Sequence, residues 1–127
     1  MRCVQEEQRD VTAERVARND ARFRESNEQL RTASKSFGFG PDELLPFLCE
    51  CADLDCTTIV QLTRREYEAV RRSPVQFINA RGHEVNAQGW AQVVDEFDRY
   101  TVVAKVGEAG QIAAELDPRQ RSGDERA

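Results

Sequence analysis

The chain has 127 residues, a formal net charge of −5 and 39% hydrophobic residues. This length suits one compact domain, and the low apolar content predicts a small core that needs an added staple such as a metal ion. The acidic balance disfavours general binding to nucleic-acid phosphates. No run approaches the roughly 18 apolar residues of a membrane span, and the N-terminus lacks the apolar core of a signal peptide, so we expect a cytoplasmic protein with no membrane partner.

The first part of the chain is predicted to be a helix. Residues 1–10 are polar and are expected to be disordered, whereas residues 11–37 contain no glycine or proline and alternate charges of both signs. Large apolar residues recur there at seven-residue spacing, at Val16, Phe23, Leu30 and Phe37. This spacing indicates a charged amphipathic helix with a thin apolar stripe.

Polar residues occupy the positions that would complete a heptad seam in this helix, namely Asp20 (or Asn19) and Asn27. A self-associating coiled coil needs apolar groups at those positions. We therefore expect the helix to lie against its own domain or against a partner, with its charged face in solvent. Two glycines and Pro41 then end the helix, and residues 38–43 are expected to act as a hinge.

A small domain is predicted over residues 44–117, and it begins with a hairpin. The segments "LLPFLC" and "TTIVQLT" flank the cysteine-rich stretch "CECADLDC", as two strands on either side of a turn would. "TRRE", residues 63–66, is a capping box that opens a helix running to about Arg72. Leu62, Tyr67 and Val70 can face the core, and the arginines of this helix, including Arg71, are expected to lie outside.

The rest of the domain alternates between strand and helix patterns. "VQFIN" predicts a strand at 75–79, residues 85–91 are ambiguous, "AQVVDEF" and "YTVVAKV" predict a second hairpin, and "GEAGQIAAEL" predicts a short helix. Residues 118–127 are expected to be a disordered tail. The fold class is therefore α+β: a long N-terminal charged helix, then a small antiparallel sheet of two hairpins with one or two short helices, stapled by a metal site.

The cysteine cluster is the clearest chemical signal. Cys49, Cys51 and Cys56 have C-x-C-x4-C spacing, and the chain's one histidine, His83, follows a predicted strand. Three sulfurs and one imidazole nitrogen form a closed tetrahedral set that suits zinc, and without a redox signature they favour zinc over iron. Asp53 and Asp55 are alternative ligands, or acceptors that orient His83. Redox-active thiols, or thiols without a ligand role, are the competing interpretations.

We predict that the protein is not an enzyme. A catalytic zinc keeps an open position beside a general base, which here would be Glu84 or Glu50 if His83 did not bind. Three thiolates make zinc a poor Lewis acid, and neither the H-x-E…P-C-x-x-C order of zinc deaminases nor H-E-x-x-H is present.

Several segments together resemble a family of small uncharacterised actinobacterial proteins. These segments are "ERVARNDARFRESNEQL", the "CECADLDC" knuckle, "EYEAVRRSPVQFINARGHE" and the closing "YTVVAKVGEAGQIAAELDPR". The chain differs from the family pattern at Arg81, where proline is usual, and at Ala104, where glutamate is usual. The resemblance implies that the three cysteines and His83 belong to one recurring site, and it implies no activity.

These observations favour a zinc-stabilised protein-interaction or regulatory module. Its partner would be another protein, and the N-terminal helix would be the docking element. One alternative is a redox- or zinc-responsive regulator whose thiols release the metal on oxidation. A less favoured alternative is a nucleic-acid-binding zinc module that uses a basic patch at Arg64, Arg65, Arg71, Arg72 and Arg81.

Overall fold

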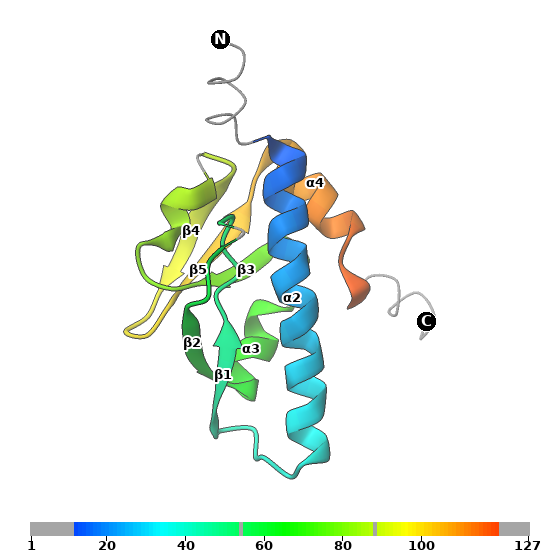
Figure 1. The fold of residues 1–127 in the computed structure, drawn as a ribbon, viewed down its shortest axis with the longest axis vertical. Coiled ribbons are helices and arrows are strands. Elements are labelled where there is room, and N and C mark those ends of the chain that lie inside the picture. Colours follow the sequence, from blue (N-terminus) through cyan, green and yellow to red (C-terminus); the bar gives the residue numbers. More distant parts are fainter. Residues whose placement is uncertain (1–11, 54, 88, 120–127) are drawn as a thin grey trace.

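A computed structural model describes residues 12–53, 55–87 and 89–119, so the predictions for residues 1–10 and for the chain after residue 119 lie outside it. A long helix, α2 (Ala13–Ser36), runs along one side of the molecule beside the shorter α4 (Gly107–Glu115) (Figure 1). The Thr12 hydroxyl begins α2 by accepting a hydrogen bond from the Arg15 N–H. The predicted helix is therefore confirmed.

Two small antiparallel sheets lie beside α2. In the first, β1 (Leu44–Leu48) pairs with β2 (Ile59–Thr63), which is the predicted hairpin around the cysteine turn. In the second, β5 (Thr101–Lys105) lies between β3 (Gln76–Asn79) and β4 (Ala91–Glu96). The β4–β5 hairpin is also as predicted, with a bulge between Val93 and Asp95. The α+β class and both hairpins are confirmed.

Helix α3 (Arg64–Val70) follows β2 directly and begins with the predicted capping box. The Thr63 hydroxyl accepts from the Glu66 N–H, and the Glu66 carboxylate accepts from the Thr63 N–H. The prediction for Arg71 is wrong, because its side chain is fully buried. Arg71 lies inside because Glu28 and Asp117 form ion pairs with it from α2 and from the segment after α4.

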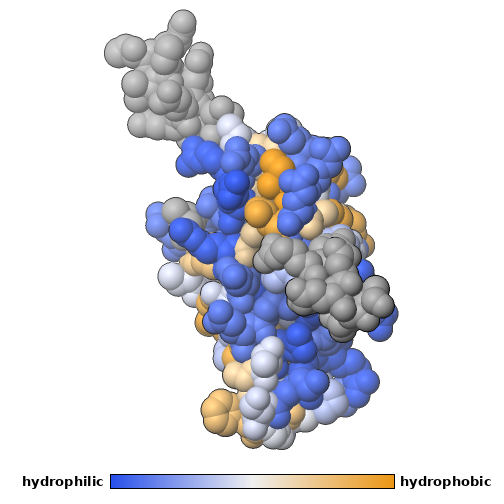
Figure 2. Space-filling model, turned by 90° about the vertical axis from the view of Figure 1, so that its right-hand side faces the viewer, coloured by the Kyte–Doolittle hydropathy of each residue, from blue (hydrophilic) through white to orange (hydrophobic). Residues whose placement is uncertain are grey.

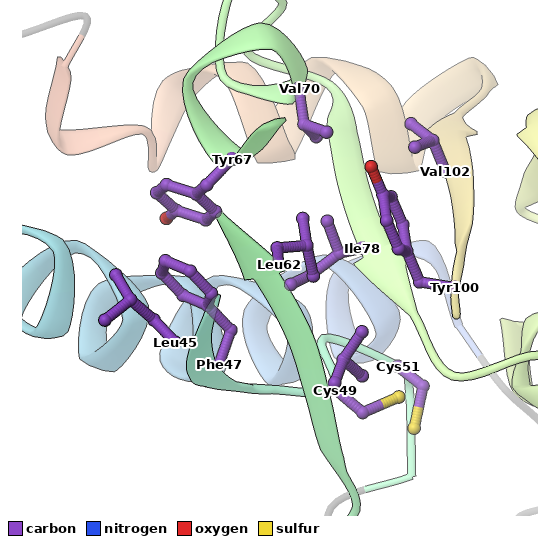
Figure 3. Close-up of a cluster of buried hydrophobic side chains, with 11 residues drawn as sticks. Leu45, Phe47, Cys49, Cys51, Leu62, Tyr67, Val70, Ile78, Tyr100 and Val102 are labelled. Carbon is purple, nitrogen blue, oxygen red and sulfur yellow. The ribbon is translucent and has the colours of Figure 1, made fainter. Parts of the chain in front are cut away.

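The hydrophobic core has two parts. The larger part lies between β1–β2, α3 and one face of the second sheet, where Phe47 and Tyr67 stack with their ring centroids 4.5 Å apart (Figure 3). The smaller part lies beneath α2 and α4 on the other face of that sheet and consists of Ala17, Phe77, Val103 and Ala113. The second sheet is therefore covered on both faces.

Beyond Ala17, the buried residues of α2 are polar. Asp20 forms an ion pair with Lys105 of β5, and both side chains are fully buried. Arg24, also fully buried, donates to the carbonyl oxygens of Pro74 at 2.8 Å and Ala113 at 3.1 Å. The expectation that the charges of this helix lie in solvent is therefore wrong for its inner face. Of the two predicted placements, the structure shows the helix against its own domain.

A second polar cluster joins α2 to the end of the described chain. Glu28 of α2 binds Arg71 and Arg119, and Arg119 also binds Glu68 of α3. Arg119 lies beyond the predicted start of the tail at residue 118, so the ordered region reaches at least that residue. The division into a helix, a hinge at 38–43 and a domain at 44–117 stays a prediction about independent folding. None of the helices among these residues is long and apolar enough to cross a membrane.

Candidate metal centre

The turn between β1 and β2 carries three thiols. The Cys49 N–H donates to the Thr58 carbonyl, which continues the hairpin one pair beyond its strands. Inside the turn, Asp53 accepts two hydrogen bonds, from the Cys56 N–H at its carbonyl and from the Asp55 N–H at its carboxylate, each 3.0 Å long. These contacts fold the loop back so that Cys56 approaches Cys49 and Cys51.

His83 reaches the same place from the second sheet. It is the first residue of a 3₁₀ turn, η1 (His83–Ala87), that follows β3. The chain turns at Gly82, whose φ of 90° is the left-handed conformation that glycine adopts without strain, and the His83 N–H donates to the Ala80 carbonyl. The imidazole therefore lies at the end of β3, beside the cysteine turn.

The four predicted ligands form one cluster. One donor atom from each of Cys49, Cys51, Cys56 and His83 lies within 4.8 Å of every other. His83 Nδ1 is 3.5 Å from the Sγ atoms of both Cys49 and Cys56. A tetrahedral ion with metal–sulfur and metal–nitrogen bonds of about 2.3 and 2.0 Å needs a sulfur–nitrogen separation of about 3.5 Å. The two measured edges match that tetrahedron, so these residues can hold a metal ion.

Hydrogen bonds from two neighbouring groups orient the sulfurs. The Ala80 N–H donates to Cys49 Sγ at 3.1 Å, and the Asn86 side-chain amide donates to Cys51 Sγ at 3.5 Å. Sequence reasoning missed Asn86. Its signal was its position three residues after His83, because residues i and i+3 of a 3₁₀ turn lie on one side. Donors of this kind stabilise thiolate ligands and hold them in position.

The cluster lies at the border of the core. Cys49 and Cys51 are buried, and both appear beside the core residues in Figure 3, whereas Cys56 and His83 are half-buried. A hydrogen bond from the Cys49 thiol lowers the pKa of Cys51, with help from the Asp53 N–H, and the same contact together with burial raises the pKa of Cys49. The two thiols therefore lie in contact, and a cation bound there would compete with their protons.

The nearby carboxylates do not join the cluster. Glu50, although it lies between two ligands in the sequence, turns into the core and accepts from the Asn27 amide at 2.8 Å and the Ile78 N–H at 3.0 Å. The Glu84 carboxylate accepts from the Gly82 N–H, and Asp53 holds its own turn. Among the described residues, the metal-ligating group contains no carboxylate. Neither of the two glutamates considered as a general base faces an open ligand position.

No protein-family model, no curated protein and no solved structure matches this chain. The resemblance to the actinobacterial family therefore stays a prediction.

Proposed function

We propose that Cys49, Cys51, Cys56 and His83 hold a structural zinc ion in a non-enzymatic, cytoplasmic interaction module. The observation that carries the proposal is the tetrahedral spacing of His83 Nδ1 from two cysteine sulfurs, 3.5 Å in each case. Zinc accepts three thiolates and one imidazole without a redox change, and closed four-ligand sites of this kind are structural. The three cysteines are free thiols, as metal ligation in a reducing compartment requires.

The site supports a structural role because all four positions of the tetrahedron would be filled by protein. A catalytic zinc needs a water ligand and a base that can take its proton. Here the nearest carboxylates are held by backbone groups or by Asn27. The zinc would instead join the β1–β2 turn to the end of β3, and its binding energy would become folding energy.

The docking role first predicted for the helix needs revision in this proposal. The inner face of α2 is already packed against the domain, with Val16 and Ala17 fully buried. Figure 2 shows that the side bearing α2 and α4 is mostly hydrophilic, with small hydrophobic areas near its upper part and at its lower end. Because the inner face of α2 is packed, only its charged outer face is left for docking. We therefore place partner binding on another surface.

The test is metal content, measured by mass spectrometry on the purified full chain. We expect about one zinc per chain in the wild type and in the control variant Glu84→Gln, whose carboxylate contacts only the backbone. Cys51→Ser and His83→Ala should bind zinc much more weakly, because each removes one of the four ligands. A wild-type chain without metal, whose thiols react freely with a thiol reagent, would overturn the proposal.

A redox-responsive regulator is the second candidate, and the half-exposed Cys56 favours it. Two thiolates would each give one electron to hydrogen peroxide, forming one disulfide and two hydroxide ions and releasing the zinc. Zinc release can be followed with a metallochromic dye during peroxide treatment. Retention of zinc at mild peroxide concentrations would exclude this role.

The basic patch of the nucleic-acid alternative is smaller than predicted. Arg71 is buried in ion pairs, Arg65 pairs with Asp42, and Arg64 and Arg81 donate to backbone carbonyls. Of the five arginines, only the Arg72 side chain makes no hydrogen bond or ion pair within the described residues. Arg64, Arg72 and Arg81 keep their positive charge, because a hydrogen bond to a neutral carbonyl does not cancel it, but three cations on a chain of net charge −5 neutralise too few phosphates for stable binding.

A further inference from the structure

A groove lies between α3 and the outer strand of the second sheet, which we call the α3–β4 groove. Its volume is about 270 Å³, and it is lined by Ala69 and Val70 from α3, Val94 from β4, and Phe97, Tyr100 and Val102 from the hairpin end and β5. The groove forms because α3 covers β3 and β5 but leaves β4 uncovered: every residue from Gln92 to Glu96 is exposed. A volume of this size suits one long side chain.

Apolar side chains gather at the groove without being covered. Val94 is 48% exposed and Phe97 is 40% exposed. Phe97 is held in place by stacking on Tyr100, with ring centroids 4.8 Å apart, and by the hydrogen bond from its N–H to the Tyr100 carbonyl. An apolar residue held open to solvent by ordered contacts is typical of a binding surface rather than of a loose loop.

The rim of the groove is acidic. Asp95 stands on the β4 wall and Glu66 on the α3 wall, and Glu96 and Asp98 are exposed nearby. The nearest cation, Arg99, is occupied, because it binds both Glu66 and the Gln61 carbonyl. Asp95 makes no ion pair among the described residues and accepts only from its neighbour, the Glu96 N–H. The pKa of Tyr100 is raised to about 12, first by burial and then by Glu66 and Asp95, while Arg99 lowers it in part.

The two edges of the second sheet differ. At the β3 edge, Glu50 covers the backbone: its N–H donates to the Ile78 carbonyl, and its carboxylate accepts from the Ile78 N–H. At the other edge, β4 pairs with β5 and with no other strand of the described residues, although η1 contacts β4. An uncovered edge strand presents backbone donors and acceptors to an extended peptide, and side-chain pockets beside it supply specificity.

A second copy of this chain is a poor occupant. The bulge between Val93 and Asp95 bends β4 and interrupts regular edge-to-edge pairing. A second copy would also bring its own Asp95 and Glu96 against the acidic rim, and like charges across a pairing are unfavourable. The surface therefore selects for a partner of opposite charge.

We propose that the α3–β4 groove binds an extended basic segment of a partner protein. An aliphatic side chain of that segment fills the groove against Val94 and Phe97, and a flanking lysine or arginine faces Asp95. The segment's backbone runs along the first residues of β4, before the bulge. This inference rests on the proposed role as an interaction module, and it gives that module a surface and a class of partner.

The experiment selects peptides from a phage-displayed random heptapeptide library on the zinc-loaded full chain. The enriched peptide is then synthesised and titrated, with binding followed by backbone amide shifts. We expect an enriched sequence that places Lys or Arg beside Val, Ile or Leu, with shifts centred on Val94, Phe97 and Tyr100. Val94→Glu should weaken binding at least about tenfold, and Asp95→Asn about threefold to tenfold.

Two variants serve as matched controls. Ile59→Glu changes an apolar residue of nearly equal exposure, 49%, on the outer side of the other sheet, and Glu25→Gln removes an exposed carboxylate from α2. Neither should alter binding. No enrichment over the Val94→Glu chain, an acidic or uncharged enriched sequence, or a stable dimer that buries β4 would each overturn the inference. Zinc content measured on every sample separates this failure from failure of the metal site.

Discussion

Two regions place polar groups inside the small core, the Cys₃His cluster and the inner face of α2, and they do so in opposite ways. In the cluster, four donors converge within 4.8 Å of one another, and all four are groups that donate electron pairs to a cation. Along α2, buried charges meet their partners directly, as Asp20 meets Lys105 and Glu28 meets Arg71. The cluster can take an ion from solution, whereas the charges of the helix face have their partners within the chain.

This difference indicates which of the two regions makes the stability of the protein depend on solution conditions. A metal site is filled or empty according to the surroundings, because its binding energy depends on metal concentration and on competing protons. A buried ion pair between two side chains of one chain responds to neither unless the pH reaches the pKa of a partner. A bound metal would thus be a staple that chelation removes, whereas the Asp20–Lys105 pair responds to pH through Asp20, whose pKa burial raises to about 7.

The largest expected effect follows from removing the metal. Structural zinc contributes on the order of 10 kcal/mol to small zinc-dependent folds, so chelation should release the β1–β2 turn and η1. We expect hydrogen exchange to accelerate at the Cys49 and His83 amides well before it accelerates at the buried centre of α2. Uniform acceleration over the whole chain would show that the two regions do not separate.

Breaking the buried Asp20–Lys105 pair should lower the free energy of unfolding by less than removing the metal does. Lys105→Met leaves Asp20 buried without its partner and should lower the free energy of unfolding by about 3–5 kcal/mol. The double variant Asp20→Leu with Lys105→Met should recover most of that loss, because it removes both charges. Urea unfolding measures the stability of the single and the double variant, and Lys35→Met at the exposed end of α2 is the control. A double variant no more stable than the single one would contradict the prediction.

The smallest expected effect depends on pH. Burial raises the pKa of Glu28, but bonds from Arg119, Tyr67 and Arg71 outweigh it and lower that pKa from 4.5 to about 2. A carboxyl with a lowered folded pKa stabilises the fold fully above its unfolded pKa, and the contribution is lost as the pH falls. Glu28→Gln should therefore lower stability by about 3 kcal/mol at pH 6, with the gap closing between pH 4.5 and 2.

Glu25→Gln, on the exposed side of the same helix, is the control for that pH profile. Any zinc bound at the cluster would leave both chains in acid, so the measured quantity is the difference between Glu28→Gln and the wild type at each pH, from chemical denaturation. A difference that stays constant from pH 6 to pH 3 would show that Glu28 acts through packing and not through its charge.

The grouping of the three cysteines with His83 could be predicted because its signals are local. Three cysteines in eight residues and one histidine after a strand pattern narrow the choice of ligands, and the capping box at Thr63 is read from four adjacent residues. Strand periodicity likewise marks both hairpins. What the sequence does not reveal locally is which nitrogen of His83 faces the sulfurs, or that Asn86 supports Cys51.

The inner face of α2 could not be predicted for the complementary reason. Arg24 can be buried because it donates a hydrogen bond to the carbonyl of Ala113, 89 residues away. Arg71 can be buried because it binds the carboxylate of Asp117, 46 residues away. A window of sequence contains the charge but not its partner, and an isolated charge in a helix is most often solvated. The role of Glu50 could not be predicted for the same reason, because its partner Asn27 is also distant in the sequence. Glu50 was considered as a general base, but its carboxylate accepts a hydrogen bond from Asn27 and so joins the cysteine turn to α2.

The position of His83 just after β3 makes metal binding sensitive to the register of that strand. His83 follows β3 by only a few residues, and its Nδ1 is 3.5 Å from two sulfurs of a different hairpin. A slip of β3 by one residue along β5 would move the imidazole by about 3.3 Å and turn its strand's side chains to the opposite face. Such a chain would lack a fourth ligand. Metal retention would therefore report that β3 had paired with β5 in the correct register.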